Sequence, residues 1–216
     1  MSNQLPLPLE PAQDFSRDSF VVGPGNRDAV DFLDLWPHWP APSVAIYGPA
    51  GSGKTHLARI WAAQVGAGII SAASLGEVEI DEIPYVVENV DIEPLSEAGE
   101  QILFALIERG APLLITGREP PLVWPVRLPD LASRTRALLG FPLWAPDDEW
   151  LGELAKKLFA FRQLVVPDSV AVAMVKSLER SPAAICAFVA RADSEALARH
   201  RPVSLSLVKD LLANEP

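Results

Sequence analysis

A run of glycines that ends in a lysine and a threonine is the segment of this sequence best suited to chemistry. Residues 48–55 read Gly-Pro-Ala-Gly-Ser-Gly-Lys-Thr, which matches the phosphate-binding pattern G-x-x-x-x-G-K-[ST] in full. Glycines let backbone N–H groups turn toward phosphate oxygens, and the N-terminus of a following helix adds its positive dipole end. The pattern therefore predicts a bound ADP or ATP, held by Gly48, Ala50, Gly51, Ser52, Gly53, Lys54 and Thr55.

A magnesium ion is expected beside the phosphates, because a phosphate loop of this kind needs a second acidic site to hold one. Thr55 offers a hydroxyl ligand, and Glu88 ends the apolar run 85–87, where the acid of that site belongs. Asp91 is a weaker candidate for the same metal. Asn89 stands where many ATPases place a water-activating glutamate, and an amide cannot accept the proton of an attacking water. We therefore expect slow intrinsic hydrolysis.

Thr116 closes another apolar run, residues 113–115, and its hydroxyl is expected to touch the γ-phosphate or the attacking water. A plainer interpretation stands beside these assignments, because polar residues are common where a buried strand meets solvent. In that interpretation Thr116 is an ordinary strand end and Glu88 is a surface charge.

The elements that must position these residues follow from the hydrophobic pattern. Short apolar runs indicate strands at residues 43–47, 69–71, 85–87, 112–116 and 137–142, and longer amphipathic patterns indicate helices from Asn26, over 54–64 and over 95–109. Strands that alternate with helices imply a parallel sheet with helices on both faces.

The character of the chain changes after Pro146. Helical patterns follow at 147–161, 168–179, 182–192 and 203–213, with no strand among them. The prediction is an α/β domain over 15–146 and a small helical lid over 147–216. Prolines rule out a core element in residues 1–14, which are expected to form an extended tail.

Composition excludes several classes of protein. The 216 residues include 18 basic and 28 acidic side chains, and a net charge of −10 is unsuited to wrapping nucleic acid. A single cysteine, Cys186, excludes an intramolecular disulfide and a cysteine metal site. No apolar stretch is long enough for a membrane span and the start is not basic, so we expect a cytoplasmic protein.

Several of these segments together resemble the AAA+ domain of bacterial DnaA-type replication initiators. The resemblance rests on the phosphate loop with His56-Leu57 after it and on segments 20–26, 88–89, 114–117 and 130–134. The pair Glu88-Asn89 is similar to that of the Hda-type members, DnaA homologues that inactivate the initiator. This resemblance implies an AAA+ fold and a negative regulator of replication initiation, associated with the replisome.

The opening residues Gln4-Leu5-Pro6-Leu7-Pro8-Leu9 are similar to the sliding-clamp-binding peptide of that group. Gln4 offers an amide to a pocket rim, Leu7 and Leu9 can fill an apolar groove beside Leu5, and the prolines reduce the ordering cost of binding. The alternative is an apolar tail without a partner. The resemblance implies two partners, the DNA polymerase sliding clamp and the initiator DnaA, with DNA reached only through the clamp.

Residues 130–134 resemble the arginine-finger segment of the family, which implies that Arg134 acts on phosphates held by a neighbouring subunit. Arg136 is a weaker second candidate, and a solvated arginine on a short helix is the plainer interpretation. The recipient is either the initiator or a second copy of this chain. The resemblance also implies an adenine contact for Asn26, which a helix cap explains equally well.

The sequence departs from the family in the lid, where Ala183 or Ala184 stands at the position of a phosphate-facing arginine. Discrimination between ATP and ADP is therefore left open.

Two rival functions use the same phosphate-binding pattern. One is an autonomous AAA+ ATPase of helicase-loader or initiator type, and both Asn89 and the net charge argue against it. The other is a small-molecule kinase, for which the sequence offers no acceptor site with a base.

Overall fold

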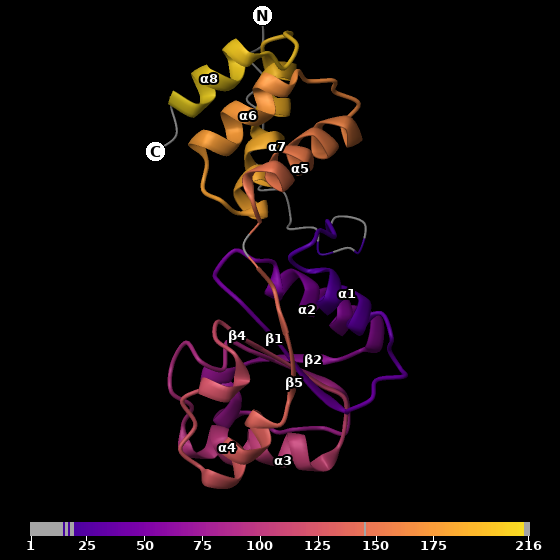
Figure 1. Cartoon of the computed structure of the whole chain (residues 1–216), viewed down its shortest axis with the longest axis vertical. Coiled ribbons are helices and arrows are strands. Elements are labelled where there is room, and N and C mark those ends of the chain that lie inside the picture. Colours follow the sequence, from indigo (N-terminus) through magenta and orange to yellow (C-terminus); the bar gives the residue numbers. More distant parts are fainter. Residues whose placement is uncertain (1–14, 16, 18–19, 145, 214–216) are drawn as a thin grey trace, which may run out of the picture.

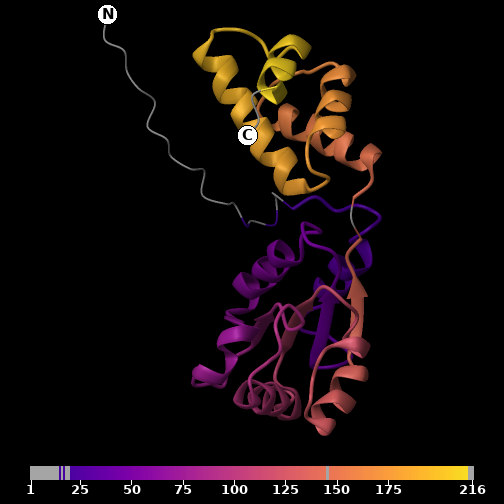
Figure 2. The same cartoon turned by 90° about the vertical axis from the view of Figure 1, so that its left-hand side faces the viewer.

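The computed structural model describes residues 15, 17, 20–144 and 146–213. Figure 1 shows a sheet with helices packed around it and, toward the C-terminus, a second group made only of helices. The view turned by 90° in Figure 2 shows the same two groups stacked along the long axis of the molecule. The expected tail residues Gln4, Leu5, Leu7 and Leu9 lie outside the described residues.

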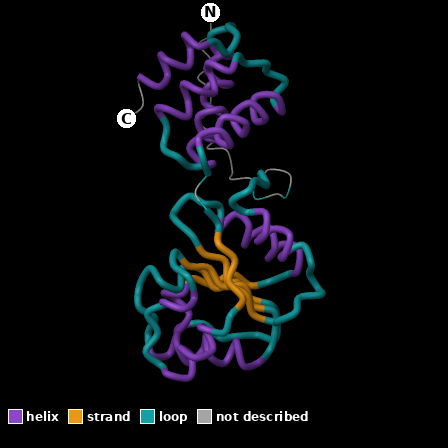
Figure 3. Tube along the Cα trace, in the orientation of Figure 1, coloured by secondary structure: helices purple, strands orange, loops and turns teal. Residues whose placement is uncertain are grey.

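One parallel sheet organises the first group. Its strands are β1 (Ser43–Tyr47), β2 (Gly68–Ser71), β3 (Tyr85–Glu88), β4 (Leu113–Gly117) and β5 (Leu139–Pro142), drawn in orange in Figure 3. They lie in the order β2-β3-β4-β1-β5, and every pairing is parallel. Parallel neighbours require a crossover connection, which explains why helical segments separate the strands in the sequence.

Different helices cover the two faces of the sheet, because side chains alternate along each strand. Val44 and Ile46 of β1 share a core with α1 (Arg27–Leu33) and α2 (Lys54–Val65). Ala45 belongs to the opposite core, with α3 (Glu97–Arg109) and α4 (Pro129–Arg136). Two short 3-10 helices, η1 (Ala72–Glu77) and η2 (Pro121–Val123), lie on the same side as α3 and α4. Strands buried on both faces explain the continuous apolar runs.

The second group consists of α5 (Asp148–Phe161), α6 (Asp168–Ser177), α7 (Pro182–Ala198) and α8 (Leu205–Ala213). These helices bury a core of their own, in which Leu151, Phe159, Met174 and Val189 are fully enclosed. Val21, which precedes α1, packs against this core. The segment before α1 therefore links the helical group to the sheet.

The expected fold class is confirmed, and the differences from expectation are local. Helix α7 continues past Ala192 to Ala198, and α1 ends at Leu33. Trp36 and Trp39, which are close in the sequence, form one cluster with the more distant Trp61: the rings of Trp39 and Trp61 stack at 4.9 Å, and Trp36 meets both edge-on. Within the described residues, no helix has the length and apolar character needed to cross a membrane.

Candidate nucleotide site

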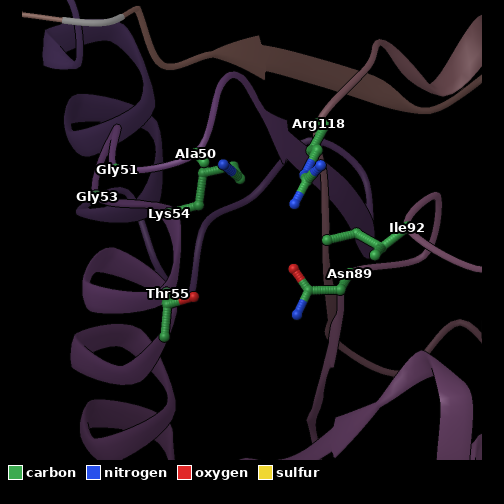
Figure 4. Close-up of a pocket in the computed structure, with 8 residues that line it drawn as sticks. All are labelled: Ala50, Gly51, Gly53, Lys54, Thr55, Asn89, Ile92 and Arg118. Atoms are coloured by element: carbon green, nitrogen blue, oxygen red, sulfur yellow. The ribbon is translucent and has the colours of Figure 1, made fainter.

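The carboxyl ends of three neighbouring strands meet at one edge of the sheet. The loop 48–53 follows β1, Asn89 follows β3 and Arg118 follows β4, which pairs with both β1 and β3. A cavity of about 160 Å³ opens between these loops. It is lined by Ala50, Gly51, Gly53, Lys54, Thr55, Asn89, Ile92 and Arg118, all labelled in Figure 4. Ligands of open parallel sheets bind at this edge.

The phosphate loop has the backbone that its glycines predict. Gly48, Gly51 and Gly53 all have positive φ angles, and Gly53 is the residue that immediately precedes α2. A side chain at Gly48 would meet the backbone, because its Cβ would lie 2.0 Å from the carbonyl oxygen of Leu143. The loop therefore curves tightly at the start of α2, the arrangement in which N–H groups and a helix dipole attract an anion.

Lys54 is buried at the first position of α2, and its ammonium group turns back onto the loop. Its Nζ donates to the carbonyl oxygens of Gly48 at 2.7 Å and Pro49 at 2.8 Å. Burial lowers the pKa of Lys54 below its usual value; Asp91 opposes this shift and Arg118 adds to it. A cation in such a place is stabilised by an anion in the cavity.

The two expected magnesium ligands differ in their surroundings. Thr55 is exposed on the cavity wall. Glu88 is partly buried, and its Oε1 atom is buried without a hydrogen-bond partner. Glu88 ends β3 and is not among the residues that line the cavity, but a buried carboxylate oxygen without a partner is a group that a divalent cation could satisfy. Among the described residues no cluster of three or more acidic, histidine or cysteine side chains could hold a metal, so phosphate and water oxygens would complete the set.

Thr116 and Asn89 are coupled by a hydrogen bond. The Thr116 hydroxyl accepts from the backbone N–H of Asn89 at 3.0 Å, and Thr116 is only 1% exposed. Asn89 has a φ of 64°, a left-handed conformation that asparagine tolerates. Thr116 thus fixes the backbone that presents Asn89 to the cavity. Its own contact with a phosphate stays a prediction.

Arg118 lines the cavity and was missed by the sequence reasoning, which stopped at Thr116. Its backbone N–H donates to both carboxylate oxygens of Asp91 at 2.8 Å, and the N–H of Glu119 donates to the same group at 2.6 Å. Asp91, expected at most as a weak metal ligand, therefore anchors the loop after β4. The sequence offered only one signal, a basic residue two positions beyond Thr116.

Arg134 lies on α4, outside the cavity. Its Nε atom contacts Glu108 Oε1 of α3 at 2.7 Å, and the two side chains are 54% and 41% exposed. Arg136 is also exposed, in the last turn of the same helix. Neither residue is among those that line the cavity, and action on a site in another molecule stays a prediction.

Asn26 uses its side chain in the segment before α1. Its Oδ1 accepts from the N–H of Gly23 at 2.8 Å, and its Nδ2 donates to the carbonyl of Val21 at 3.0 Å. Asn26 occupies the N-cap position of α1, but its side chain makes no capping hydrogen bond there. The helix-cap alternative is therefore right about the position of Asn26 but not about a side-chain hydrogen bond to the helix. An adenine contact stays a prediction.

The lid arginines nearest the start of α7 are engaged elsewhere. Arg180 pairs with Asp148 at 3.0 Å, and Arg191 donates to the carbonyl of Leu211 at 2.9 Å. Ser181, which caps α7, approaches the phosphate loop closely, since a Cβ on Gly51 would lie 3.0 Å from its own Cβ. The lid reaches the loop with a serine instead of an arginine.

Comparison of the sequence with known proteins does not assign this chain to a family. No protein-family model matches the chain. A protein of Haemophilus influenzae described as uncharacterized is 26% identical over 237 residues, and the match covers 98% of this chain and 99% of that protein. The chain is thus similar to a protein of nearly the same length.

Solved structures show the same architecture. Domain III of the Thermotoga maritima replication initiation protein DnaA has a TM-score of 0.72 at 21% identity, covering 93% of this chain and 96% of that domain. DnaA bound to AMPPCP and single-stranded DNA has a TM-score of 0.69 at 17% identity, covering 88% and 68%. The Thermotoga maritima RuvB branch migration motor has a TM-score of 0.62 at 20% identity, covering 91% and 70%. The chain has the AAA+ fold of these proteins.

Proposed function

We propose that this chain is a nucleotide-bound, Hda-type regulator that stimulates hydrolysis of ATP on the initiator DnaA and so limits replication initiation. The observation that carries the proposal is the position of Arg134. It is exposed on α4 and separate from the chain's own phosphate loop, in a fold that matches domain III of DnaA over nearly its whole length. A finger in that position is suited to act in trans.

The chain's own cavity binds ADP or ATP through the phosphate loop, with Lys54 at its centre. Thr55 and Glu88 would hold a Mg²⁺ ion, which neutralises phosphate charge when bound. Asn89 occupies the cavity wall where a general base would be needed, so the bound nucleotide turns over slowly. Asn26 would contact the adenine.

Arg134 supplies a guanidinium to the phosphates of the docked initiator. Its partner in the free chain, Glu108, is about half exposed, and exposed ion pairs contribute only about 0–1 kcal/mol. Docking therefore releases Arg134 at a small free-energy cost. The guanidinium then stabilises charge that develops as the initiator's ATP is cleaved.

The tail residues Gln4, Leu5, Leu7 and Leu9 bind the sliding clamp and bring the chain to DNA on which a clamp has been loaded. DNA itself is contacted through the clamp, which agrees with a net charge of −10. In this proposal the tail (1–14) binds the clamp, the domain 15–146 holds the nucleotide and carries Arg134, and the lid (147–216) covers the phosphate loop.

The proposal is tested by mixing the purified chain with clamp-loaded DNA and initiator that carries labelled ATP. We expect faster phosphate release only when chain, clamp and DNA are all present. Release at the same rate without the chain would refute the proposed function.

An autonomous AAA+ ATPase is the second candidate, and the likeness to the RuvB motor favours it. Such a protein must hydrolyse ATP by itself. Basal turnover of several ATP per second by the isolated chain would support this alternative against the first, whereas we expect a far lower rate because Asn89 lacks a carboxylate.

A further inference from the structure

Arg118 stands across the cavity from the phosphate loop. In Figure 4 its side chain comes from the loop after β4 and extends into the space between Lys54 and Asn89. No ion pair or side-chain hydrogen bond engages its guanidinium among the residues that the structure describes. It is an exposed cation directed at a site built for an anion.

The backbone beneath Arg118 is held firmly. Asp91 accepts from the N–H groups of Arg118 and Glu119 at 2.6–2.8 Å. The indole N–H of Trp124 donates to the carbonyl of Glu119 at 2.8 Å, so both sides of the loop are tied. The backbone of Arg118 is therefore already fixed, and only its side-chain torsions remain to be ordered when the guanidinium binds.

Lys54 and Arg118 both line the cavity, so two positively charged side chains face the same space. Their mutual repulsion adds to the burial that lowers the pKa of Lys54, and Asp91 offsets only some of that effect. An anion between the two groups would relieve the repulsion. Among the described lid residues, the two arginines nearest the start of α7 make contacts elsewhere: Arg180 forms an exposed ion pair with Asp148, and Arg191 donates to the carbonyl of Leu211.

We propose that Arg118 contacts the terminal phosphate of a bound nucleoside triphosphate and thereby sets the preference of this site for ATP over ADP. The proposal rests on the nucleotide site described above. The loop 48–53 and Lys54 surround the inner phosphates, and Arg118 faces them from the far wall, where the third phosphate extends. In this proposal the arginine that distinguishes ATP from ADP lies in the loop after β4, whereas the family resemblance places such an arginine in the lid.

The test compares dissociation constants for ADP and for the non-hydrolysable analogue AMPPCP, both with Mg²⁺. Arg118→Ala is expected to weaken AMPPCP binding about 10- to 100-fold, the usual range for a lost charge-assisted hydrogen bond. ADP binding should weaken less than about threefold, because its phosphates end before Arg118. Arg118→Lys should restore some of the AMPPCP affinity, since a point charge replaces a bidentate donor.

Arg199→Ala is the matched control, because Arg199 is an exposed lid arginine that pairs with Glu195 and does not line the cavity. It should leave both constants unchanged. Equal weakening of ADP and AMPPCP by Arg118→Ala, or no change in either, would overturn the role of Arg118 while leaving the nucleotide site intact. A wild-type chain that binds neither nucleotide would overturn the site itself and this inference with it.

Discussion

Asn89 is the residue that most directly separates binding from catalysis in this cavity. Its side chain lines the wall opposite Thr55, and its backbone is fixed by the Thr116 hydroxyl at 3.0 Å. The position is therefore well ordered for a catalytic base, but its amide cannot act as one. The cavity thus presents an amide at the place where the proposed nucleotide would need a proton acceptor for hydrolysis.

Asn89→Asp should raise basal ATP turnover by about 10- to 100-fold, because a carboxylate at this place can accept a proton from water. Aspartate tolerates the left-handed backbone at this position, where φ is 64°. Phosphate release under saturating ATP measures the effect. Asn89→Gly is the control that keeps the backbone and removes the side chain. If the aspartate variant binds ATP normally but is no faster than the glycine variant, Asn89 does not limit hydrolysis.

The part of the site that could be predicted from the sequence alone is the phosphate loop, because its residues form a motif of fixed spacing. The loop 48–55 has a spacing that leaves few alternatives, whereas the metal role of Glu88, inferred because an apolar strand leads to it, stays a prediction, since Glu88 does not line the cavity. Arg118 has no such spacing, and only the parallel pairing of β1 with β4 brings its loop beside the phosphate loop. The contact between Thr116 and Asn89 joins residues 27 positions apart, which no local pattern encodes.

Helix α3 positions the helix that carries Arg134, through a single buried carboxylate. Glu100 is only 3% exposed and accepts from the N–H groups of Arg127 at 2.9 Å and Leu128 at 2.7 Å, just before α4. The side chain of Arg127 donates to the same group at 3.3 Å. Burial tends to raise the pKa of Glu100, but these hydrogen bonds outweigh it and the net shift is downward.

Glu100→Ala should lower the free energy of unfolding by about 2–4 kcal/mol, because it leaves buried donors without an acceptor. Glu100→Gln keeps the shape and should cost about 1 kcal/mol. Because the folded-state pKa lies below the ordinary value of 4.5, this stabilisation is present above pH 4.5 and is lost as pH falls through the folded-state pKa.

Urea unfolding at neutral pH and at about pH 3 measures both effects. The difference between wild type and Glu100→Gln should shrink at the lower pH. A difference that stays constant with pH would mean that the charge of Glu100 contributes nothing.

At the level of elements, periodicity predicted the strands and most helices because each buries an apolar face. It predicted the boundaries less well. Helix α7 runs to Ala198 because Ala192 and Ala196 continue its buried face, although charged residues between them obscure the pattern. The 3-10 helices η1 and η2 contain a glycine and a proline, respectively, and both are too short to show an amphipathic period.

On the scale of the whole molecule, the proposed function assigns three tasks to separate parts of the chain. The phosphate loop and Arg118 belong to the nucleotide cavity, Arg134 lies on α4 away from it, and the residues proposed to bind the clamp precede residue 14. The account therefore predicts that each task can be lost without the others.

The combined variant Gln4→Ala, Leu7→Ala and Leu9→Ala should weaken binding to the sliding clamp at least about 30-fold, since interface anchors each contribute about 2 kcal/mol or more. Affinity for ADP should not change. Immobilised clamp and fluorescent ADP measure the two properties. Replacement of Asn3, Glu10 and Gln13 by alanine is the control, because it changes three neighbouring side chains to which no clamp contact is assigned. Full clamp binding by the first variant would refute the role of the tail.

Arg134 gives the most direct test of the central claim. Initiator carrying labelled ATP is mixed with clamp-loaded DNA and with either wild-type chain or Arg134→Ala, each already saturated with unlabelled ADP, and phosphate release is followed through a single turnover. Arginine fingers accelerate hydrolysis about 10³- to 10⁵-fold, so the variant should lose at least about 100-fold of the stimulated rate while its clamp and ADP affinities stay normal. Equal phosphate release with wild type and Arg134→Ala would contradict the account.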